Sequence, residues 1–332
     1  MSPAIEIHHL TKKFRTYRKK PGLKGAIQGL FHREYDETIA ANEISFSVQP
    51  GEFVGFLGPN GAGKTTTLKM LSGLLHPTSG TASVLGFTPS LRENEFKKRF
   101  SLVMGQKNAL WWDLAAADSL ELSRVIYQIE KPVYQKRLDE LTELLDIKDK
   151  LNILVRELSL GERMKLELIN ALIHSPQVLL LDEPTIGLDV TSQKKVRDFL
   201  KSYNETYKVT ILLTSHYMQD IEELCSRVVL IDEGMLRYDG ALSGIVEKFS
   251  GTKIIQMHLH KPLSHPIPEH WGEILESTGL LLKLKVPRER ISDVCREILA
   301  ATTLSDITIE EVPIEEIMRQ LFRTQRPTFS SE

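Results

Sequence analysis

The chain has 332 residues, of which 26% are charged and 41% hydrophobic, and 42 basic and 44 acidic side chains give a formal net charge of -2. This length suggests about two domains of roughly 150 residues each. The charge balance excludes a globally basic nucleic-acid-binding protein, though not a local basic patch, and we expect no nucleic-acid partner. No apolar run approaches the roughly 20 residues of a membrane-spanning helix. We expect folding in the cytosol, with any membrane contact made through a partner or a surface.

Three regions of the chain differ in character. Residues 11–33 contain eight basic residues and no acidic one. Residues from about 40 to 245 alternate apolar strand patterns with amphipathic helix patterns, which is typical of a parallel α/β sheet. After a boundary near residue 250, weaker strand patterns over 254–260, 280–286 and 307–312 predict a small α+β domain.

The strongest motif is a glycine-rich loop between a buried strand pattern, FVGFLG, and a helix pattern, TTTLKMLSGLL. It fits G-x-x-x-x-G-K-[ST], the pattern of a phosphate-binding loop. Glycines let several backbone N–H groups face one anion, and the helix start adds partial positive charge. Lys64 is expected to reach the outer phosphates of a nucleotide, and the Thr65 hydroxyl to hold Mg²⁺. The predicted loop comprises Gly58, Pro59, Asn60, Gly61, Ala62, Gly63, Lys64, Thr65 and Thr66.

Two adjacent carboxylates follow a second buried strand pattern. The apolar run 178–181 ends in Asp182 and Glu183, and a parallel strand delivers such residues to the ligand edge of its sheet. Asp182 is expected to support Mg²⁺, and Glu183 to polarise a water that attacks the γ-phosphate. Because adjacent carboxylates beside a triphosphate would repel it without a metal, the pattern implies Mg²⁺.

Between these motifs lies the segment LSLGER at 158–163, followed by a long helix pattern. With it, the chain resembles the nucleotide-binding subunits of ABC transporters, whose signature is usually written LSGGQ. Other marks of the family stand in the expected order: Gln106 after a strand, the run 187–189, and His216 after the strand VTILLTS. The resemblance covers about residues 5–245.

The resemblance implies a fold class: α/β, a P-loop NTPase core of the ABC ATPase type with an antiparallel β subdomain and a helical subdomain. The expected ATPase domain spans 1–250, with a basic insert at about 18–35 and the helical subdomain at about 107–170. A small α+β accessory domain is expected at 251–332. The resemblance also implies a head-to-tail dimer with two ATP molecules at its interface, and we expect the two chains to be identical.

The same resemblance assigns roles to single residues. Ser159 and Gly161 of the signature would contact the ATP held by the loop of the second subunit, and Asp189 would communicate between the two sites. Gln106 would sense Mg²⁺ and the γ-phosphate and link to the membrane subunit, while His216 would hold the γ-phosphate and orient Glu183. Lys64, Glu183 and His216 are the expected catalytic residues; Thr65, Gln106 and Asp182 are expected near the metal; Phe14 is expected to stack on adenine.

The signature departs from the family pattern at two positions, Leu160 and Glu162. Ser159 and Glu162 fit the S-x-x-E capping box of a helix N-terminus. We therefore expect the Glu162 carboxylate to turn back toward the Ser159 N–H, and we expect a subfamily variant with full activity. An impaired ATPase site is the alternative.

The remaining features concern partners. The insert 18–35 carries an apolar stripe among lysines and arginines, which suits a membrane surface or a permease, with a solvated hairpin as the alternative. Trp111 and Trp112 are expected to face the groove that receives the permease in this family. The resemblance favours an exporter subunit that works with a separate ABC-2-type permease, bound peripherally at the cytoplasmic face of the inner membrane. The alternatives are an importer ATPase with a regulatory tail and a non-transport ABC ATPase.

Overall fold

The computed structural model describes residues 2–17, 35–105, 107–249, 251–261, 266–313 and 316–317. Gln106 and the predicted basic insert, apart from its last residue, lie outside these ranges. The chain divides into two compact units, Met1–Asp239 and Gly240–Glu332. Over the described residues, no helix combines the length and apolarity that crossing a membrane requires.

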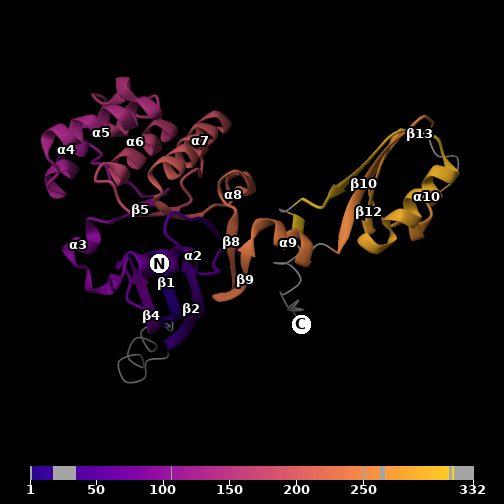
Figure 1. The fold of residues 1–332 in the computed structure, drawn as a ribbon, viewed down its shortest axis with the longest axis horizontal. Coiled ribbons are helices and arrows are strands. Elements are labelled where there is room, and N and C mark those ends of the chain that lie inside the picture. Colours follow the sequence, from indigo (N-terminus) through magenta and orange to yellow (C-terminus); the bar gives the residue numbers. More distant parts are fainter. Residues whose placement is uncertain are drawn as a thin grey trace, which may run out of the picture. The chain divides into compact units, whose positions relative to one another are not determined.

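A six-stranded sheet forms the centre of the first unit (Figure 1). The strands β3 (Phe53–Leu57), β6 (Val178–Asp182) and β7 (Thr210–Thr214) are buried at every position, as expected for parallel strands covered on both faces. They lie side by side and run parallel, so their carboxyl ends meet at one edge of the sheet. The full order is β5-β6-β7-β3-β8-β9, with β5 at Phe100–Met104, β8 at Arg227–Asp232 and β9 at Met235–Ala241.

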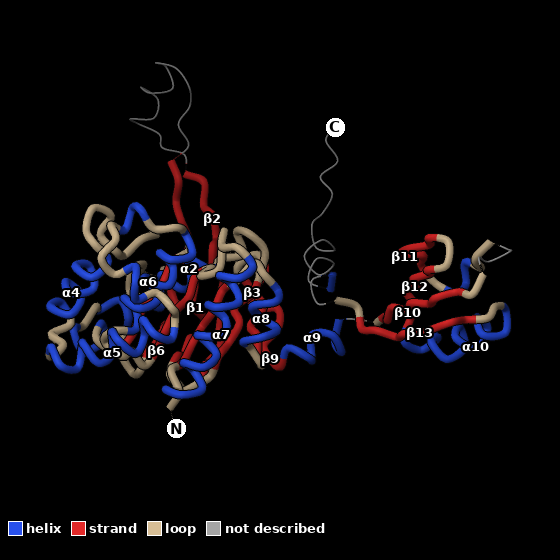
Figure 2. The backbone as a smooth tube through the Cα atoms, turned by 90° about the horizontal axis from the view of Figure 1, so that it is seen from above, coloured by secondary structure: helices blue, strands red, loops and turns tan. Residues whose placement is uncertain are grey.

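An antiparallel sheet covers this core, as predicted. Its order is β2-β1-β4, with β1 at Ile5–Tyr17, β2 at Tyr35–Val48 and β4 at Ser79–Val84. Figure 2 shows the paired arms of β1 and β2 extending beyond the body of the unit. Ile5, Ile7 and Leu10 of β1 share one buried cluster with residues of the six-stranded sheet. Burial of each such side chain stabilises the fold by about 1.5–3 kcal/mol.

The helices α4 (Ala116–Ile126), α5 (Lys131–Leu144) and α6 (Leu160–Leu172) gather on the side of the unit opposite β1 and β2 in Figure 1. They form the predicted helical subdomain. The helix after the glycine-rich loop, α2 (Lys64–Leu71), is shorter than its pattern through residue 75 predicts, because Gly73 takes a left-handed φ of 72°. The other helices of this unit are α3 at Asn94–Lys97, α7 at Val190–Tyr207 and α8 at Met218–Leu224.

The second unit begins with the end of β9 and α9 (Leu242–Phe249), and the three strands predicted in its sequence are present. Its sheet has the order β11-β12-β10-β13, and α10 (Ile291–Ala301) contributes Val294 and Ile298 to the core on the buried face. The strands are β10 at Thr252–Leu259, β11 at Glu273–Thr278, β12 at Leu281–Pro287 and β13 at Leu304–Glu311.

Candidate functional site

The glycine-rich loop joins β3 to α2, and two of its glycines have no substitute. An added Cβ at Gly58 would lie 2.3 Å from the carbonyl oxygen of Ile231, and one at Gly63 would lie 1.9 Å from that of Ala40. Gly61 has a φ of 85° and an open surrounding, since an added Cβ there would meet nothing within 4 Å. The loop therefore wraps tightly at its base and leaves its backbone open at the tip.

Lys64 holds the loop from its first helical position. Its Nζ donates to the carbonyl oxygens of Gly58 at 2.6 Å and of Pro59 at 3.1 Å. The residue is buried, and this desolvation lowers its pKa below the usual 10.5, although Glu183 and Asp182 oppose the shift. The ammonium group thus lies under the loop and within the field of two carboxylates, where it can reach an anion held by the loop.

Asp182 ends β6 and accepts one hydrogen bond on each carboxylate oxygen. The Thr65 hydroxyl donates to Oδ2 at 2.9 Å, and the Thr214 hydroxyl donates to Oδ1 at 2.8 Å. The parallel sheet explains this convergence, because Asp182 and Thr214 are register partners at the ends of adjacent strands. The structure thereby places the predicted Thr65 and Asp182 together.

Glu183 follows directly and contacts His216. The Oε1 atom of Glu183 lies 2.8 Å from Nε2 of His216. The Glu183 backbone has a left-handed φ of 56°, which costs a non-glycine residue about 1–2 kcal/mol. Two hydrogen bonds hold it there, since its N–H donates to the carbonyl oxygen of Thr214 at 3.0 Å and to the Thr214 hydroxyl at 3.1 Å.

Gly105 also belongs to this edge of the sheet, although the sequence interpretation did not single it out. Its N–H donates to the carbonyl oxygen of Asp182 at 2.8 Å. A Cβ at this position would lie 2.1 Å from the carbonyl oxygen of Glu183, so only glycine fits. Its place immediately before Gln106 at the end of a strand was the available signal.

The signature segment caps α6 in the way its sequence predicts. Ser159 is the N-cap: its hydroxyl accepts from the N–H of Glu162 at 3.3 Å, and the Glu162 carboxylate accepts from the N–H of Ser159 at 2.9 Å. Lys150 lies 3.2 Å from the other oxygen of Glu162. Hydrogen bonds from Ser159, followed by the contact with Lys150, hold the pKa of Glu162 below its usual value. The expected turn of Glu162 toward Ser159 is confirmed.

The signature packs against the segment that precedes α7 in the same chain. An added Cβ at Gly161 would lie 2.7 Å from the Ser192 hydroxyl, and one at Gly187 would lie 3.0 Å from the side chain of Leu160. Leu160, one of the two departures from the family pattern, therefore fills space beside Gly187. Asp189 is the N-cap of α7, and its carboxylate accepts from both the N–H and the hydroxyl of Ser192.

The structure separates the predicted residues into two groups. In the described part of the chain, neither Ser159, Gly161 nor Asp189 forms a hydrogen bond or ion pair with the loop 58–66. Phe14 is exposed on β1 opposite Thr38, with Lys12 Nζ 5.4 Å from its ring centroid. The other predicted loop residues, Pro59, Asn60, Ala62 and Thr66, lie in the loop and the first turn of α2, with Ala62 buried and Asn60 exposed.

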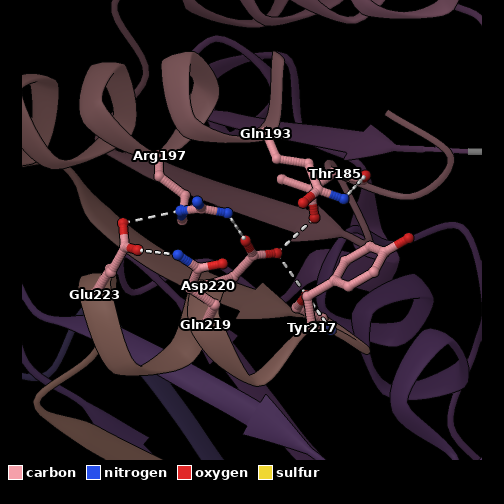
Figure 3. A network of polar contacts seen from close by, with 8 residues as sticks. Thr185, Gln193, Arg197, Tyr217, Gln219, Asp220 and Glu223 are labelled. Atoms are coloured by element: carbon pink, nitrogen blue, oxygen red, sulfur yellow. Dashed lines mark hydrogen bonds and ion pairs between the residues drawn. The ribbon is translucent and has the colours of Figure 1, made fainter. Parts of the chain in front are cut away.

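A buried polar network that includes Thr185 and Ser215 was not predicted from the sequence (Figure 3). Its centre is Asp220 on α8, which accepts hydrogen bonds from Thr185, Ser215 and Arg197. Arg197 on α7 also donates to Glu223 at 2.8 Å. A buried acid in a short helix gives no signal in a single sequence.

A groove of about 690 Å³ lies between β5, the segment after it and the helical subdomain. Leu74, Phe100 and Ile126 supply apolar lining, and Arg92, Lys97, Lys98 and Lys107 supply positive charge. Trp111 and Trp112 follow this segment along the chain and are 59% and 46% exposed. Arg163 lies over the Trp112 ring at 5.3 Å from its centroid.

The loop, the buried Asp182 and the Glu183–His216 pair lie at the carboxyl ends of adjacent parallel strands, an arrangement that suits a phosphate and a metal ion. Comparison with known proteins agrees. A family model described as ABC transporter matches residues 41–186, and one described as EvrA-like ABC transporter, C-terminal domain, matches residues 251–310.

The alignments with two curated relatives cover most of the length of each relative. The ABC transporter ATP-binding protein NatA of Bacillus subtilis (strain 168) is 36% identical over 208 residues, which cover 63% of this chain and 84% of the relative. The Nod factor export ATP-binding protein I of Burkholderia pseudomallei (strain 1710b) is 36% identical over 231 residues, covering 70% of this chain and 75% of the relative. The chain belongs to the ATP-binding proteins of ABC transporters, and it is an ATPase.

Solved structures share the fold. An ATP-binding subunit of an ABC transporter superposes with a TM-score of 0.61 at 23% identity, covering 74% of this chain and 93% of that chain. The ATP-binding cassette MJ0796, solved as a dimer in a post-hydrolysis state with ADP and Pi, gives a TM-score of 0.60 at 23% identity, covering 72% and 98%.

Proposed function

We propose that this chain is the ATP-hydrolysing subunit of an exporter, and that it works as a dimer on a separate ABC-2-type permease. The observation that carries the proposal is the convergence of Lys64, the Thr65–Asp182 pair and the Glu183–His216 pair at one sheet edge. The names of two relatives support the direction of transport, since one is a Nod factor export protein and another is the linearmycin resistance protein LnrL of Bacillus subtilis (strain 168).

The residues of the loop fit a triphosphate and Mg²⁺. The open backbone at Gly61 suits the approach of an anion, and Lys64 supplies a cation beneath it. The Thr65 hydroxyl and the Asp182 carboxylate are hard oxygen donors 2.9 Å apart, and Mg²⁺ prefers one or two protein oxygens together with phosphates and waters. When bound, Mg²⁺ would neutralise the charge of the phosphates beside Asp182 and Glu183.

Glu183 is the proposed general base. It directly follows Asp182, and its carboxylate is held by His216, so it can accept a proton from a water beside the outer phosphate. His216 is 37% exposed, against 16% for Glu183. The imidazole therefore lies on the accessible side of the pair, where it can also contact phosphate.

The second group of predicted residues is proposed to act on the nucleotide of the partner subunit. Ser159 and Gly161 stand at the N-terminus of α6, where free N–H groups and the helix dipole favour an anion. The N–H of Ser159 fixes the Glu162 carboxylate at this terminus, and the ion pair with Lys150 offsets part of its negative charge. Since these residues have no bond to their own loop, a head-to-tail pair of chains gives each signature a phosphate to bind.

The groove and the tryptophans are the proposed permease surface. Exposed tryptophans are typical centres of a protein interface, and Trp111 and Trp112 follow the segment that lines this groove. Through this contact the chain would lie peripherally at the cytoplasmic face of the inner membrane, while the permease selects the exported substrate. Residues 251–332, matched in part by the EvrA-like C-terminal family, are proposed as an accessory domain for dimer contact or regulation.

Steady-state ATP turnover of the purified full chain tests the proposal. We expect turnover that requires Mg²⁺ and disappears with EDTA. Thr65→Ala and Asp182→Asn should each raise the Mg²⁺ concentration needed for half-maximal turnover, because each removes a proposed metal partner. Thr142→Ala, which removes a buried hydroxyl from α5, is the control and should keep the wild-type Mg²⁺ requirement. Unchanged Mg²⁺ dependence in both site variants would refute the metal assignment.

A further inference from the structure

A fully buried ion pair joins α7 to α8 behind the catalytic edge. The side chains of Arg197 and Asp220 are 2% and 1% exposed, and Nη1 of Arg197 lies 3.0 Å from Oδ1 of Asp220. Replacing such a pair with well-packed apolar residues often leaves a protein equally or more stable, because desolvation offsets the attraction. Stability alone therefore does not explain why a charge pair occupies this place.

The other oxygen of Asp220 binds two hydroxyls that flank the proposed catalytic residues. Oδ2 accepts from the Thr185 hydroxyl at 2.5 Å and from the Ser215 hydroxyl at 2.6 Å. Thr185 comes two residues after Glu183, and Ser215 comes immediately before His216. One carboxylate oxygen thus ties the segment carrying the base to the segment carrying the histidine.

The Glu183 backbone needs such support. Its φ of 56° is a conformation that L residues avoid, and it persists only where the surroundings hold it. On the N-terminal side, Thr214 binds the Glu183 N–H. On the C-terminal side, the Thr185 hydroxyl is fixed by Asp220. The two sides together set the direction in which the Glu183 side chain leaves the chain.

The network also reaches the helix that begins after Asp189. Arg197 lies on α7 and donates to both Asp220 and Glu223. Gln193, one turn earlier on α7, donates to the carbonyl oxygen of Thr185 at 3.5 Å. Figure 3 shows these side chains converging from α7 and α8 on the Asp220 carboxylate and Thr185. A displacement of α7 would therefore shift both the segment that carries Glu183 and the segment that carries His216.

We propose that Asp220 is a positioning residue for ATP hydrolysis. Through Thr185 and Ser215 it fixes Glu183 and His216 relative to each other, and through Arg197 it ties this geometry to α7. The proposal rests on the roles proposed above for Glu183 and His216. It assigns Asp220 no contact with nucleotide, so its loss should affect the chemical step and leave ATP binding intact.

Because removal of Asp220 itself risks unfolding, the test uses its two hydroxyl partners in the full chain. Thr185→Val and Ser215→Ala should each lower kcat for ATP hydrolysis at least about tenfold, since misplacement of a catalytic group by about 1 Å can cost a hundredfold. KM for ATP should change less than about threefold. Thr185→Ser keeps the hydroxyl and should retain at least about half of wild-type kcat.

The double variant Thr185→Val/Ser215→Ala adds a readout that a packing role would not move. Because both hydroxyls act through one oxygen, its kcat should fall by clearly less than the product of the two single effects. Thr142→Val removes an equally buried hydroxyl that, among the described residues, bonds only to carbonyls of α5, and it should leave kcat within about twofold.

Two results would overturn the proposal. The first is a Thr185→Val protein that loses thermal stability as Thr142→Val does while keeping wild-type kcat. The second is a loss that appears in KM alone. Glu183→Gln, assayed in parallel, separates this proposal from the function on which it rests. An inactive Glu183→Gln with a fully active Thr185→Val refutes only the positioning role, whereas an active Glu183→Gln refutes both.

Discussion

His216 Nε2 lies 2.8 Å from Glu183 Oε1, and this contact joins the ends of two adjacent parallel strands. The pair stands one residue beyond Asp182 on one strand and two residues beyond Thr214 on the other. Its geometry thus follows from the strand register. A carboxylate held in this way is suited to the proposed role of Glu183 as a base toward water.

Replacement of Glu183 by Gln tests this role. The amide keeps the shape of the side chain but cannot accept a proton from water, so turnover should fall about a hundredfold or more, the usual scale for a positioned base. ATP affinity, measured by equilibrium binding of a fluorescent analogue, should stay near the wild-type value. Near-normal turnover in this variant would mean that another group is the base.

Because His174 is buried, we expect the folded chain to lose stability in acid. Its ring stacks on Tyr127 with centroids 3.9 Å apart, and its Nδ1 is buried with no hydrogen-bond partner among the described residues. Burial therefore lowers its pKa from 6.5 to about 4. Since the unfolded chain binds the proton first, stability falls as the pH drops from about 6.5 toward 4, by about 2 kcal/mol at about pH 5.

The variant His174→Phe keeps the ring stack and removes the titrating group. Its free energy of unfolding in urea should therefore depend less on pH than that of the wild type over the same interval. All other histidines are common to both proteins, so the difference isolates His174. Parallel pH profiles for the two proteins would show that His174 does not bear this charge penalty.

Glu162 has the opposite effect from His174, because its charged carboxylate stabilises the folded chain. Its pKa is lowered from 4.5, chiefly by the hydrogen bond from the Ser159 N–H. Its stabilising contribution is present above about pH 4.5 and is lost as the pH falls through the folded-state pKa. Glu162→Gln should therefore destabilise the chain at neutral pH and cost progressively less in acid, as urea titrations at several pH values would show.

Lys150→Met is the control for this experiment. The contact with Lys150 is a smaller cause of the Glu162 shift than the bonds from Ser159, so this variant should keep most of the pH dependence. A destabilisation by Glu162→Gln that is the same at every pH would mean that the capping box does not depend on the charge of Glu162.

Replacement of Trp111 or Trp112 should weaken binding to the permease without slowing ATP hydrolysis by the chain alone. Both side chains are exposed, so Trp111→Ala and Trp112→Ala should leave basal ATP turnover unchanged. Truncation of an interface centre costs about 2 kcal/mol or more, which is roughly thirtyfold in affinity for the co-expressed permease. Leu144→Ala, an exposed apolar residue on α5, is the control. Wild-type permease affinity in the double tryptophan variant would place the interface elsewhere.

Features that depend on the order of elements along the chain could be predicted from the sequence. A strand, a glycine-rich loop and a helix must follow one another for Lys64 and Thr65 to face a ligand, and Asp182 must end a buried strand. The order of these elements and the end of β6 at Asp182 are confirmed, and the contacts with a ligand stay predictions. The capping box of Ser159 and Glu162 is confirmed for the same reason, because its partners are three residues apart.

The features that depend on packing could not be predicted. Asp220 meets Thr185 across 35 positions of sequence and Arg197 across 23, and no periodicity links such residues. The left-handed backbone of Glu183 and the close approach of Gly105 to it likewise follow from how neighbouring strands end. The early end of α2 was missed because the apolar spacing continues past Gly73, where the backbone leaves the helix.

In the proposed head-to-tail dimer, two chains share each nucleotide, the loop of one facing the signature of the other. Sedimentation of the Glu183→Gln full chain tests it most directly, since slow hydrolysis should preserve the ATP-bound dimer. Ser159→Asp in this background keeps an equally good N-cap but adds a negative charge at the α6 terminus, and Ser159→Asn keeps the cap without the charge. With ATP and Mg²⁺, we predict dimers for Glu183→Gln alone and with Ser159→Asn, and monomers with Ser159→Asp. A Glu183→Gln chain that stays monomeric in saturating ATP, or a Ser159→Asp chain that dimerises equally well, would contradict the account.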